Sequence, residues 1–478
     1  MKRLIVIIAA VFTFGVVNMS AVEPDQKSEP KNHFKLYGFI RNYFIYDSRE
    51  SVSGTGDLFY YLPKDVQKND KGEDLNATSS FRFLSLTSRL GVDVTGYQIG
   101  NVAFGAKIEG DFYSGLSSVD DKKFPDVKTW FPANTKISGT AAARLRQAYA
   151  TVTWKDLPLN EEQKASVALK IGQAWHPMAA DIPHIFSLEA GAPFGPFSRT
   201  PLVQMDANLG NHFVLSAAAI WQMQYQSQGP VGASAIYMKY GMTPEVYAAV
   251  GFKGKDFLVR AGADLLSIKP RVLGQVEAKD EYDETVLRTV KVSDRKTSIL
   301  YYIYGQYTHG KFALKAKSTY GQGGEHLNLM SGYAKVGENE DGSWNYASLR
   351  NSSSWVSMSY GKKWQAVLFL GYVKNFGLAE GILDEPIAKS NVYFCGNGFS
   401  NINQMYRVNP QIVYNIGKMN IGLEYQWTSV QYGDYVDAQD CSDGTCKIVP
   451  GLDVNGLASK NLHWVGNHRV NMMVKYNF

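Results

Sequence analysis

The sequence predicts an all-β fold, a transmembrane antiparallel up-and-down β-barrel of about 16 strands, from two observations. The first is the closing segment, residues 465–478, in which apolar and polar side chains alternate with a period of two. Successive side chains of a strand point to opposite faces, so this segment has one apolar face and one polar, basic face. The second is the connections, in which long loops alternate with short turns. That rhythm predicts long extracellular loops at one end and short periplasmic turns at the other.

The composition fits this fold. With 13% aromatic and 19% charged residues, and with 44 Gly and 29 Tyr among 478 residues, the chain is rich in strand and turn formers. The mean hydropathy of −0.22 is compatible with a barrel, because lipid-facing and interior side chains average out along each strand.

The amino terminus predicts export. Two basic residues precede an apolar run over residues 4–17, which is typical of a signal peptide covering residues 1–21. The alternative, a buried core helix, is disfavoured by the polar, proline-containing stretch over residues 23–31. After cleavage, a short periplasmic segment, residues 22–33, would precede one barrel domain over residues 34–478. No later apolar run reaches the ~18 residues of a spanning helix, which excludes a helical membrane protein.

Taken in order, the alternating or β-rich segments number about 16, and most reach the ~9–11 residues that cross a bilayer at a tilt. They are 34–46, 80–97, 100–114, 142–154, 165–174, 200–209, 212–225, 244–253, 256–269, 295–309, 311–321, 350–361, 363–376, 400–417, 418–433 and 464–478. We assign residues 229–243 to a loop, although part of that stretch could pass as a strand. A seventeenth strand would conflict with the even strand numbers of bacterial single-chain barrels.

Charged side chains avoid one face of each clearly alternating strand. In residues 256–269, for example, Phe257 and Val259 alternate with Arg260 and Asp264. A Lys or Arg side chain facing lipid at the bilayer midplane costs about 2–4 kcal/mol, so the charged faces should point into the barrel. Four segments, 34–46, 142–154, 295–309 and 363–376, carry bulky groups on both faces, so alternation alone does not decide their orientation.

About 16 strands enclose more space than side chains can fill, so the interior should be water-filled. The alternation of faces along each strand predicts which residues line it. The charged lining residues are predicted to be Arg41, Arg89, Lys107, Glu109, Asp111, Arg144, Arg146, Lys170, Arg260, Asp264, Lys315, Lys317, Arg407, Glu424, Arg469 and Lys475. Basic residues outnumber acidic ones, and such a wall concentrates anions and repels cations. The alternative is that these charged residues form ion pairs with one another, which stabilise the wall and do not select solutes.

The loop over residues 175–199 is predicted to fold inward and to narrow the interior. It is apolar and rich in Pro and Gly, and burial inside the barrel would remove its apolar groups from water. Asp181, Glu189 and Arg199 would then be the polar groups of this constriction loop. Packing of the same loop at a subunit interface is the alternative.

The three Cys residues indicate one disulfide and one leftover thiol. Cys441 and Cys446 bracket a short Ser-Asp-Gly-Thr stretch and could pair in an oxidising compartment, whereas Cys395 has no evident role. No metal or cofactor is expected. Among the His residues, His176 and His184 are interpreted as loop or aromatic-belt residues, because no Cys or carboxylate partner stands at ligand spacing.

Enzymatic activity is not expected, because the sequence contains no Gly-x-Ser-x-Gly, Walker or His-Glu-x-x-His motif. Two rival classes stay open. A barrel hydrolase could assemble Ser, His and Asp from different strands, and an adhesin or receptor could display the long loops with the pore incidental.

Four stretches carry a family resemblance: LYGFIRNYFIYDS (36–48), RLRQAYATVTW (144–154), GQAWHPM (172–178) and RTPLVQM (199–205). In their residues and in their order along the chain, these stretches resemble the trimeric DcaP-like and phosphate-selective porin group. The resemblance implies a homotrimer in the bacterial outer membrane, in contact with its lipid, that passively admits small, mostly anionic solutes; no nucleic-acid partner is implied. It also implies that Arg41, Arg144, Arg146 and Arg199 line the path.

The closing segment is predicted to pair with residues 34–46, because this pairing removes the open edges of the sheet. Its Arg469 and Lys475 would face the interior. Tyr476 and Phe478 would form a lipid-facing tail that a barrel assembly machinery recognises.

Overall fold

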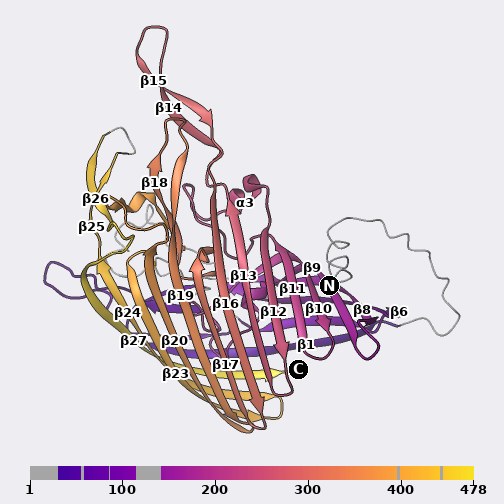
Figure 1. Ribbon diagram of the computed structural model, residues 1–478. Helices are drawn as coiled ribbons and strands as arrows, with labels where there is room; N and C mark the ends of the chain where they lie inside the picture. Colours follow the sequence, from indigo (N-terminus) through magenta and orange to yellow (C-terminus); the bar gives the residue numbers. More distant parts are fainter. Residues whose placement is uncertain (1–30, 55–58, 86, 115–140, 396–398, 442–444) are drawn as a thin grey trace.

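A computed structural model describes residues 31–54, 59–85, 87–114, 141–395, 399–441 and 445–478. The chain forms a closed antiparallel barrel of 16 strands, which confirms the predicted fold class and strand number (Figure 1). Its wall consists of β1 (His33–Asp47), β4 (Ser80–Leu84) continued by β5 (Arg89–Thr95), β7 (Val102–Ser114), β8 (Ala141–Pro158), β9 (Lys164–Trp175), β10 (Arg199–Leu209), β11 (Phe213–Ile220), β12 (Glu245–Lys253), β13 (Phe257–Ile268), β16 (Lys296–His309), β17 (Phe312–Gln322), β19 (Trp344–Gly361), β20 (Trp364–Leu378), β23 (Ile402–Ile416), β24 (Met419–Asp434) and β27 (Lys460–Asn477). The predicted signal peptide and residues 22–30 lie outside the described residues.

The barrel closes where the first strand meets the last. β1 pairs antiparallel with β27 in the register Phe39↔Asn477 to Asp47↔Arg469, so the predicted closing pair is confirmed. The backbones of Gly38 and Phe478 exchange hydrogen bonds of 3.1 and 3.3 Å beyond that register. The ring of Phe478 covers Gly38, where an added Cβ would lie 2.7 Å from Phe478 Cζ.

The second wall strand is interrupted, although the sequence predicts it as continuous over residues 80–97. β1 pairs with β4 through Tyr43–Asp47 and with β5 through His33–Phe39, and the chain bulges between β4 and β5. At the bulge, hydroxyl groups replace ladder contacts. Ser88 Oγ accepts a hydrogen bond from the Arg41 backbone (3.3 Å), and Thr87 Oγ1 accepts one from Arg41 Nε (3.1 Å). The interruption therefore orients Arg41.

The side-chain alternation follows the predicted parity. On β27, Val470, Met472 and Tyr476 are exposed on the outer surface, whereas Arg469 and Asn471 are at most 3% exposed. Because the strand period is two, a one-residue error in register would exchange these faces, so the pattern also fixes the register. The short turns fit the sequence as well. Gly210, Gly310 and Gly417 each adopt a φ near +60°, a conformation that glycine adopts at little steric cost.

The longer connections gather at one end of the barrel, where further elements build on its rim (Figure 1). A hairpin of β14 (Leu273–Lys279) and β15 (Thr285–Lys291) extends farthest, and β18 (Gly332–Glu338) pairs with the part of β19 that precedes residue 350. This pairing explains why β19 begins before the predicted residue 350. The remaining rim elements are β21 (Ile387–Ala388), β22 (Val392–Phe394), β25 (Val436–Asp440) and β26 (Lys447–Leu452).

The stretch 229–243, assigned to a loop from the sequence, contains the short helix α3 (Ile236–Gly241) and no strand. The chain therefore keeps an even strand number. Among the described residues, none of the helices has the length and apolar character needed to span a bilayer.

The hydrophobic core lies inside the barrel. It combines wall side chains such as Tyr43, Trp355 and Phe369 with loop side chains such as Phe194 and Phe197. These loop residues come from the connection between β9 and β10. A second set comes from the hairpin of β2 (Ser51–Gly54) and β3 (Phe59–Pro63), in which every residue of β3 is buried.

Candidate functional site

The connection from residue 176 to residue 198, here called the inner loop, contacts wall strands that are far apart in the sheet. Tyr43 on β1 donates to the Phe186 carbonyl (2.6 Å), and Gln411 on β23 accepts from the Phe186 amide (3.1 Å). Lys317 on β17 donates to the carbonyls of Met178 (2.7 Å) and Asp181 (2.9 Å). The inner loop therefore spans the interior of its own chain.

His184 in the inner loop accepts or donates a hydrogen bond with Ser359 Oγ (2.7 Å) on β19. Burial, followed by the charge of Lys315, lowers the pKa of His184 below its ordinary value. The imidazole is consequently neutral at neutral pH. It does not add to the positive charge of the interior.

The β2–β3 hairpin is a second inward segment, which was not predicted from the sequence. Tyr60, Tyr61 and Leu62 are at most 2% exposed. Tyr432 on β24 donates to the Pro63 carbonyl (2.5 Å), and Tyr61 contacts the Tyr225 hydroxyl (3.0 Å). The apolar run Phe-Tyr-Tyr-Leu-Pro within an otherwise polar loop is the signal that could have revealed it.

Arg407 on β23 connects both inward segments to the wall. Its Nη1 lies 3.2 Å from Glu189 Oε1 of the inner loop, and its Nη2 donates to the carbonyls of Tyr61 (2.7 Å) and Tyr60 (3.3 Å). Its Nε donates to Thr428 Oγ1 on β24 (2.9 Å). Both Arg407 and Glu189 are fully buried. Arg407 thus belongs to the support of the inward segments, and its side chain does not lie on an open channel surface.

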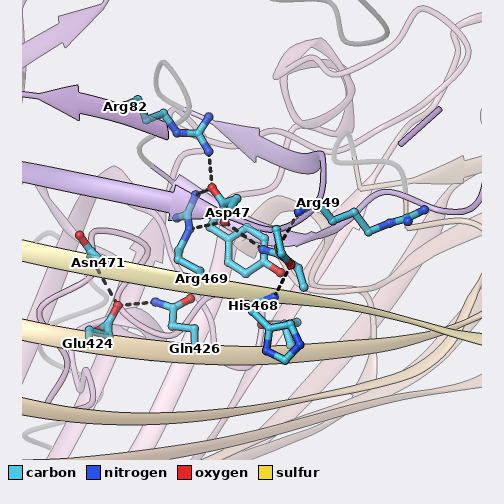
Figure 2. Close-up of polar contacts among 12 residues, drawn as sticks. Asp47, Arg49, Arg82, Glu424, Gln426, His468, Arg469 and Asn471 are labelled. Atoms are coloured by element: carbon cyan, nitrogen blue, oxygen red, sulfur yellow. Dashed lines mark hydrogen bonds and ion pairs between the residues drawn. The ribbon is translucent and has the colours of Figure 1, made fainter. Parts of the chain in front are cut away.

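Asp47, at the end of β1, contacts two arginines at the seam of the barrel, where β1 pairs with β27 (Figure 2). Arg469 donates from Nε and Nη2 to the two carboxylate oxygens at 2.8 and 2.9 Å, and Arg82 on β4 also pairs with Asp47. Arg469 in turn lies 4.4 Å from the centroid of the Tyr60 ring. A two-point Arg–carboxylate contact fixes orientation as well as distance, so this group sets the position of the hairpin relative to the seam.

Glu424 forms a neighbouring buried group (Figure 2). Its Oε1 accepts hydrogen bonds from Gln426 (2.5 Å) on the same strand and from Asn471 (3.4 Å) on β27. Predicted as a lining residue, Glu424 points inward but is fully buried beneath the inward segments.

A cluster of arginines lies on β5 and β8, beside two carboxylates of β7. Arg144 and Arg146 on β8 contact Asp111 at 2.9 and 2.5 Å, and Arg146 also contacts Glu109 at 2.9 Å. Arg89 lies 3.5 Å from Glu109. A bulge in the pairing of β7 with β8, between Glu109 and Gly110, brings both arginines of β8 to the same carboxylate pair.

Two further arginines add positive charge to this region, and neither has a carboxylate as its ion-pair partner among the described residues. Arg41 and Arg199 form no ion pair with a carboxylate within the described part of the chain. Arg41 lies over the rings of Phe39 and Tyr43, and Arg199 lies over Trp175 at 5.0 Å and makes no hydrogen bond through Nη1.

The whole group, here called the arginine cluster, has more cations than anions. It comprises Arg41, Arg89, Arg144, Arg146, Arg199 and Lys475 against Glu109 and Asp111, which gives 6 − 2 = +4. The positive charges are close enough to repel one another: Arg146 acts on Arg41, Arg89 and Arg199. A permeating anion would relieve this repulsion.

An open cavity of about 720 Å³ lies beside the arginine cluster, between β8–β13, β16 and the start of the inner loop. Its charged lining includes Lys170, Asp181, Asp206, Lys253 and Arg260. Arg260 and Asp181 pair at 2.5 Å, which joins the wall to the start of the inner loop.

The remaining predicted lining residues have other partners. Lys107 pairs with Asp93 on the neighbouring strand at 3.0 Å, and Lys315 donates to the Ile182 carbonyl (3.2 Å) of the inner loop. Asp264 is 2% exposed and lies next to His176, His326 and the carboxylate Glu245, so it does not line the cavity. Cys441 and Cys446 are joined in a disulfide, and Cys395 is a buried free thiol.

Two solved structures are similar to this chain. The crystal structure of the outer membrane channel DcaP of Acinetobacter baumannii is similar with a TM-score of 0.56 at 16% identity, covering 95% of this chain and 99% of that chain. An anion-selective porin from Comamonas acidovorans has a TM-score of 0.47 at 9% identity, covering 94% and 100%. No protein-family model and no curated protein matches the sequence. The resemblance seen in the sequence is confirmed at the level of the fold.

Proposed function

We propose, from the fold that it shares with outer-membrane channels, that this protein is an outer-membrane porin. It is a passive diffusion channel for small hydrophilic solutes, with a weak preference for anions. The observation that carries the anion preference is the arginine cluster, in which six cations face two carboxylates beside an open cavity. In a wall of low dielectric constant, such an excess favours the entry of anions.

The membrane location is supported by the outer surface of the barrel. Leu36, Ile303, Leu423 and Val470, on widely separated strands, are all exposed, and closure leaves the wall without an unpaired edge. A closed barrel with an apolar outer band satisfies its backbone groups within a bilayer. The proposal includes export through the signal peptide at residues 1–21, an extracellular position for the β14–β15 end, and a homotrimer.

Conductance of the purified full-length protein in planar bilayers tests the proposal. Stepwise openings are expected, and in a salt gradient the reversal potential should have the sign of anion preference. Absence of stepwise current from folded protein would contradict the channel and favour display of the projecting β14–β15 hairpin as the function. A clear cation preference would refute the role given to the arginine cluster.

Replacing Phe478 by aspartate is expected to reduce the amount of folded barrel in the outer membrane. The change places a charge on the lipid-facing side of the seam and removes the ring that covers Gly38. The folded fraction can be measured by heat-modifiable migration in gels, with Asn477→Asp as the control that adds the same charge on the neighbouring residue. Equal folded fractions for Phe478→Asp and the unmodified protein would refute a role for Phe478 in assembly.

A further inference from the structure

Four residues far apart in the sequence form a buried group near the rim. His176 directly follows β9, Glu245 begins β12, Asp264 lies on β13, and His326 lies in the short helix η2 (Glu325–Leu327). His326 Nε2 is 3.2 Å from Glu245 Oε1 and 3.6 Å from Asp264 Oδ2. His176 Nε2 is 2.6 Å from Glu245 Oε1. All four side chains are at most 3% exposed.

Hydrogen bonding within the described residues does not satisfy this group. Glu245 Oε2, Asp264 Oδ1 and both ring nitrogens of His326 lack a hydrogen-bond partner. A buried polar group without a partner costs about 1–3 kcal/mol, and more when it is charged. His326 Nε2 lies within 3.6 Å of both carboxylates but makes no hydrogen bond to either, which indicates a ligand that accepts lone pairs, and a cation is the simplest such ligand.

The charges and spacings favour a divalent cation. Metal binding requires ionised carboxylates and neutral imidazoles, and in that state the group carries a charge of about −2, which a divalent ion neutralises. Bonds of ~2.0–2.2 Å to nitrogen and oxygen place neighbouring ligand atoms ~3.0–3.6 Å apart. The distances from His326 Nε2 to the two carboxylates fall in that range. The nearby Lys296 lies 3.6 Å from Glu325, so its charge already has an acidic neighbour.

His176 differs from the other three residues. Its Nδ1 accepts a hydrogen bond from the Met178 amide (3.2 Å), so in the neutral ring Nε2 carries the proton. That proton is directed at Glu245 Oε1, which makes His176 a positioning residue for a ligand and not a ligand itself. The 2.6 Å contact is also shorter than the spacing of two atoms on one metal ion.

We propose that Glu245, Asp264 and His326 bind one divalent first-row transition-metal ion of the zinc class, with His176 orienting Glu245. The imidazole and two carboxylates match the donors that such ions accept. The bound ion would join β12 and β13 to the segment around η2. This site is structural and independent of whether the barrel conducts.

The test uses full-length protein in detergent, exchanged against ZnCl₂, desalted, and measured for metal content by mass spectrometry. About one zinc per chain is expected. Asp264→Asn and His326→Gln should each lose the bound zinc, whereas His176→Ala should weaken zinc affinity by about 10- to 100-fold. His463→Gln is the matched control, because His463 also contacts a carboxylate, Asp65 at 2.6 Å, outside this group.

Cobalt(II) provides a second readout, since a nitrogen- and oxygen-ligated Co²⁺ ion gives a visible absorption band that reports on its ligands. The band should be present in the unmodified protein and the His463→Gln variant and absent in His326→Gln. Unmodified protein that retains no zinc and gives no band would overturn the proposal, even if every variant failed to fold. Variants that retain zinc at the unmodified level would overturn it as well.

Discussion

Substitution of Arg407 by alanine is expected to increase single-channel conductance and to destabilise the folded barrel by about 3–5 kcal/mol. The substitution leaves Glu189 buried without its cation and frees the carbonyls of Tyr60 and Tyr61. Both inward segments then lose their contacts with Arg407, and the inner loop keeps only its Gln411 hydrogen bond among those described here to β23. The interior should widen and the current per open channel should rise.

Two measurements separate these effects. The midpoint of heat-induced unfolding in detergent should fall in Arg407→Ala and partly recover in Arg407→Met/Glu189→Gln, because the double variant leaves no unpaired buried charge. Conductance should stay raised in the double variant, since the hairpin carbonyls still lack their donor. Deletion of residues 182–189, which removes Glu189 itself, should also raise conductance.

The matched control for Arg407 is Lys107→Ala. Lys107 is also an interior cation, but it pairs with Asp93 of the neighbouring wall strand and, within the described residues, with no residue of either inward segment. Its loss should leave the channel size unchanged. Folded Arg407→Ala protein with unmodified conductance would show that contacts such as Lys317 to Asp181 hold the inward segments without Arg407.

The barrel could be predicted because its signals are local. Alternation along a strand such as β27 depends only on which side chains face lipid, and turn glycines such as Gly310 mark where a strand must reverse. Sixteen local patterns then close the sheet without information about distant contacts. Even the closing pair follows, because an antiparallel sheet without edges must join its first and last strands.

The interior could be predicted only in part. Parity places Arg144 and Arg407 on the inner face, but it does not show that Arg144 contacts Asp111 or that Arg407 contacts a loop residue 218 positions away. The proposed metal-binding group illustrates the same limit, because Glu245 and His326 come together only when β12, β13, β16 and β17 pair in the sheet. Ligand spacing along the chain therefore gave no sign of them.

Replacement of Arg41 and Arg199 together by glutamine is expected to shift the reversal potential in a salt gradient strongly toward cation preference. These two arginines have no carboxylate partner within the described residues, so their charges are not cancelled locally. Removing them lowers the net charge of the arginine cluster from +4 to +2 by the same count. Arg144 and Arg146 would be poorer targets, because their loss leaves Asp111 exposed.

The expected size follows from Coulomb's law. A unit charge ~8 Å from a permeating ion contributes about 2 kcal/mol at an effective dielectric constant of ~20. Since ~1.4 kcal/mol corresponds to tenfold in an equilibrium constant, two charges can change anion partitioning more than tenfold. The gradient should be measured near 0.1 M salt, where the screening length is about 10 Å, because 1 M salt reduces it to about 3 Å.

The control for charge count is the double variant Lys155→Gln/Lys362→Gln. Both lysines are exposed near the short turns, so the chain loses the same charge away from the arginine cluster. If both double variants shifted the reversal potential equally, selectivity would reflect the total charge of the protein. If only Arg41→Gln/Arg199→Gln shifts the reversal potential, the ion selectivity arises from the arginine cluster. The reason is that only charges within a screening length of the path act on the permeating ion.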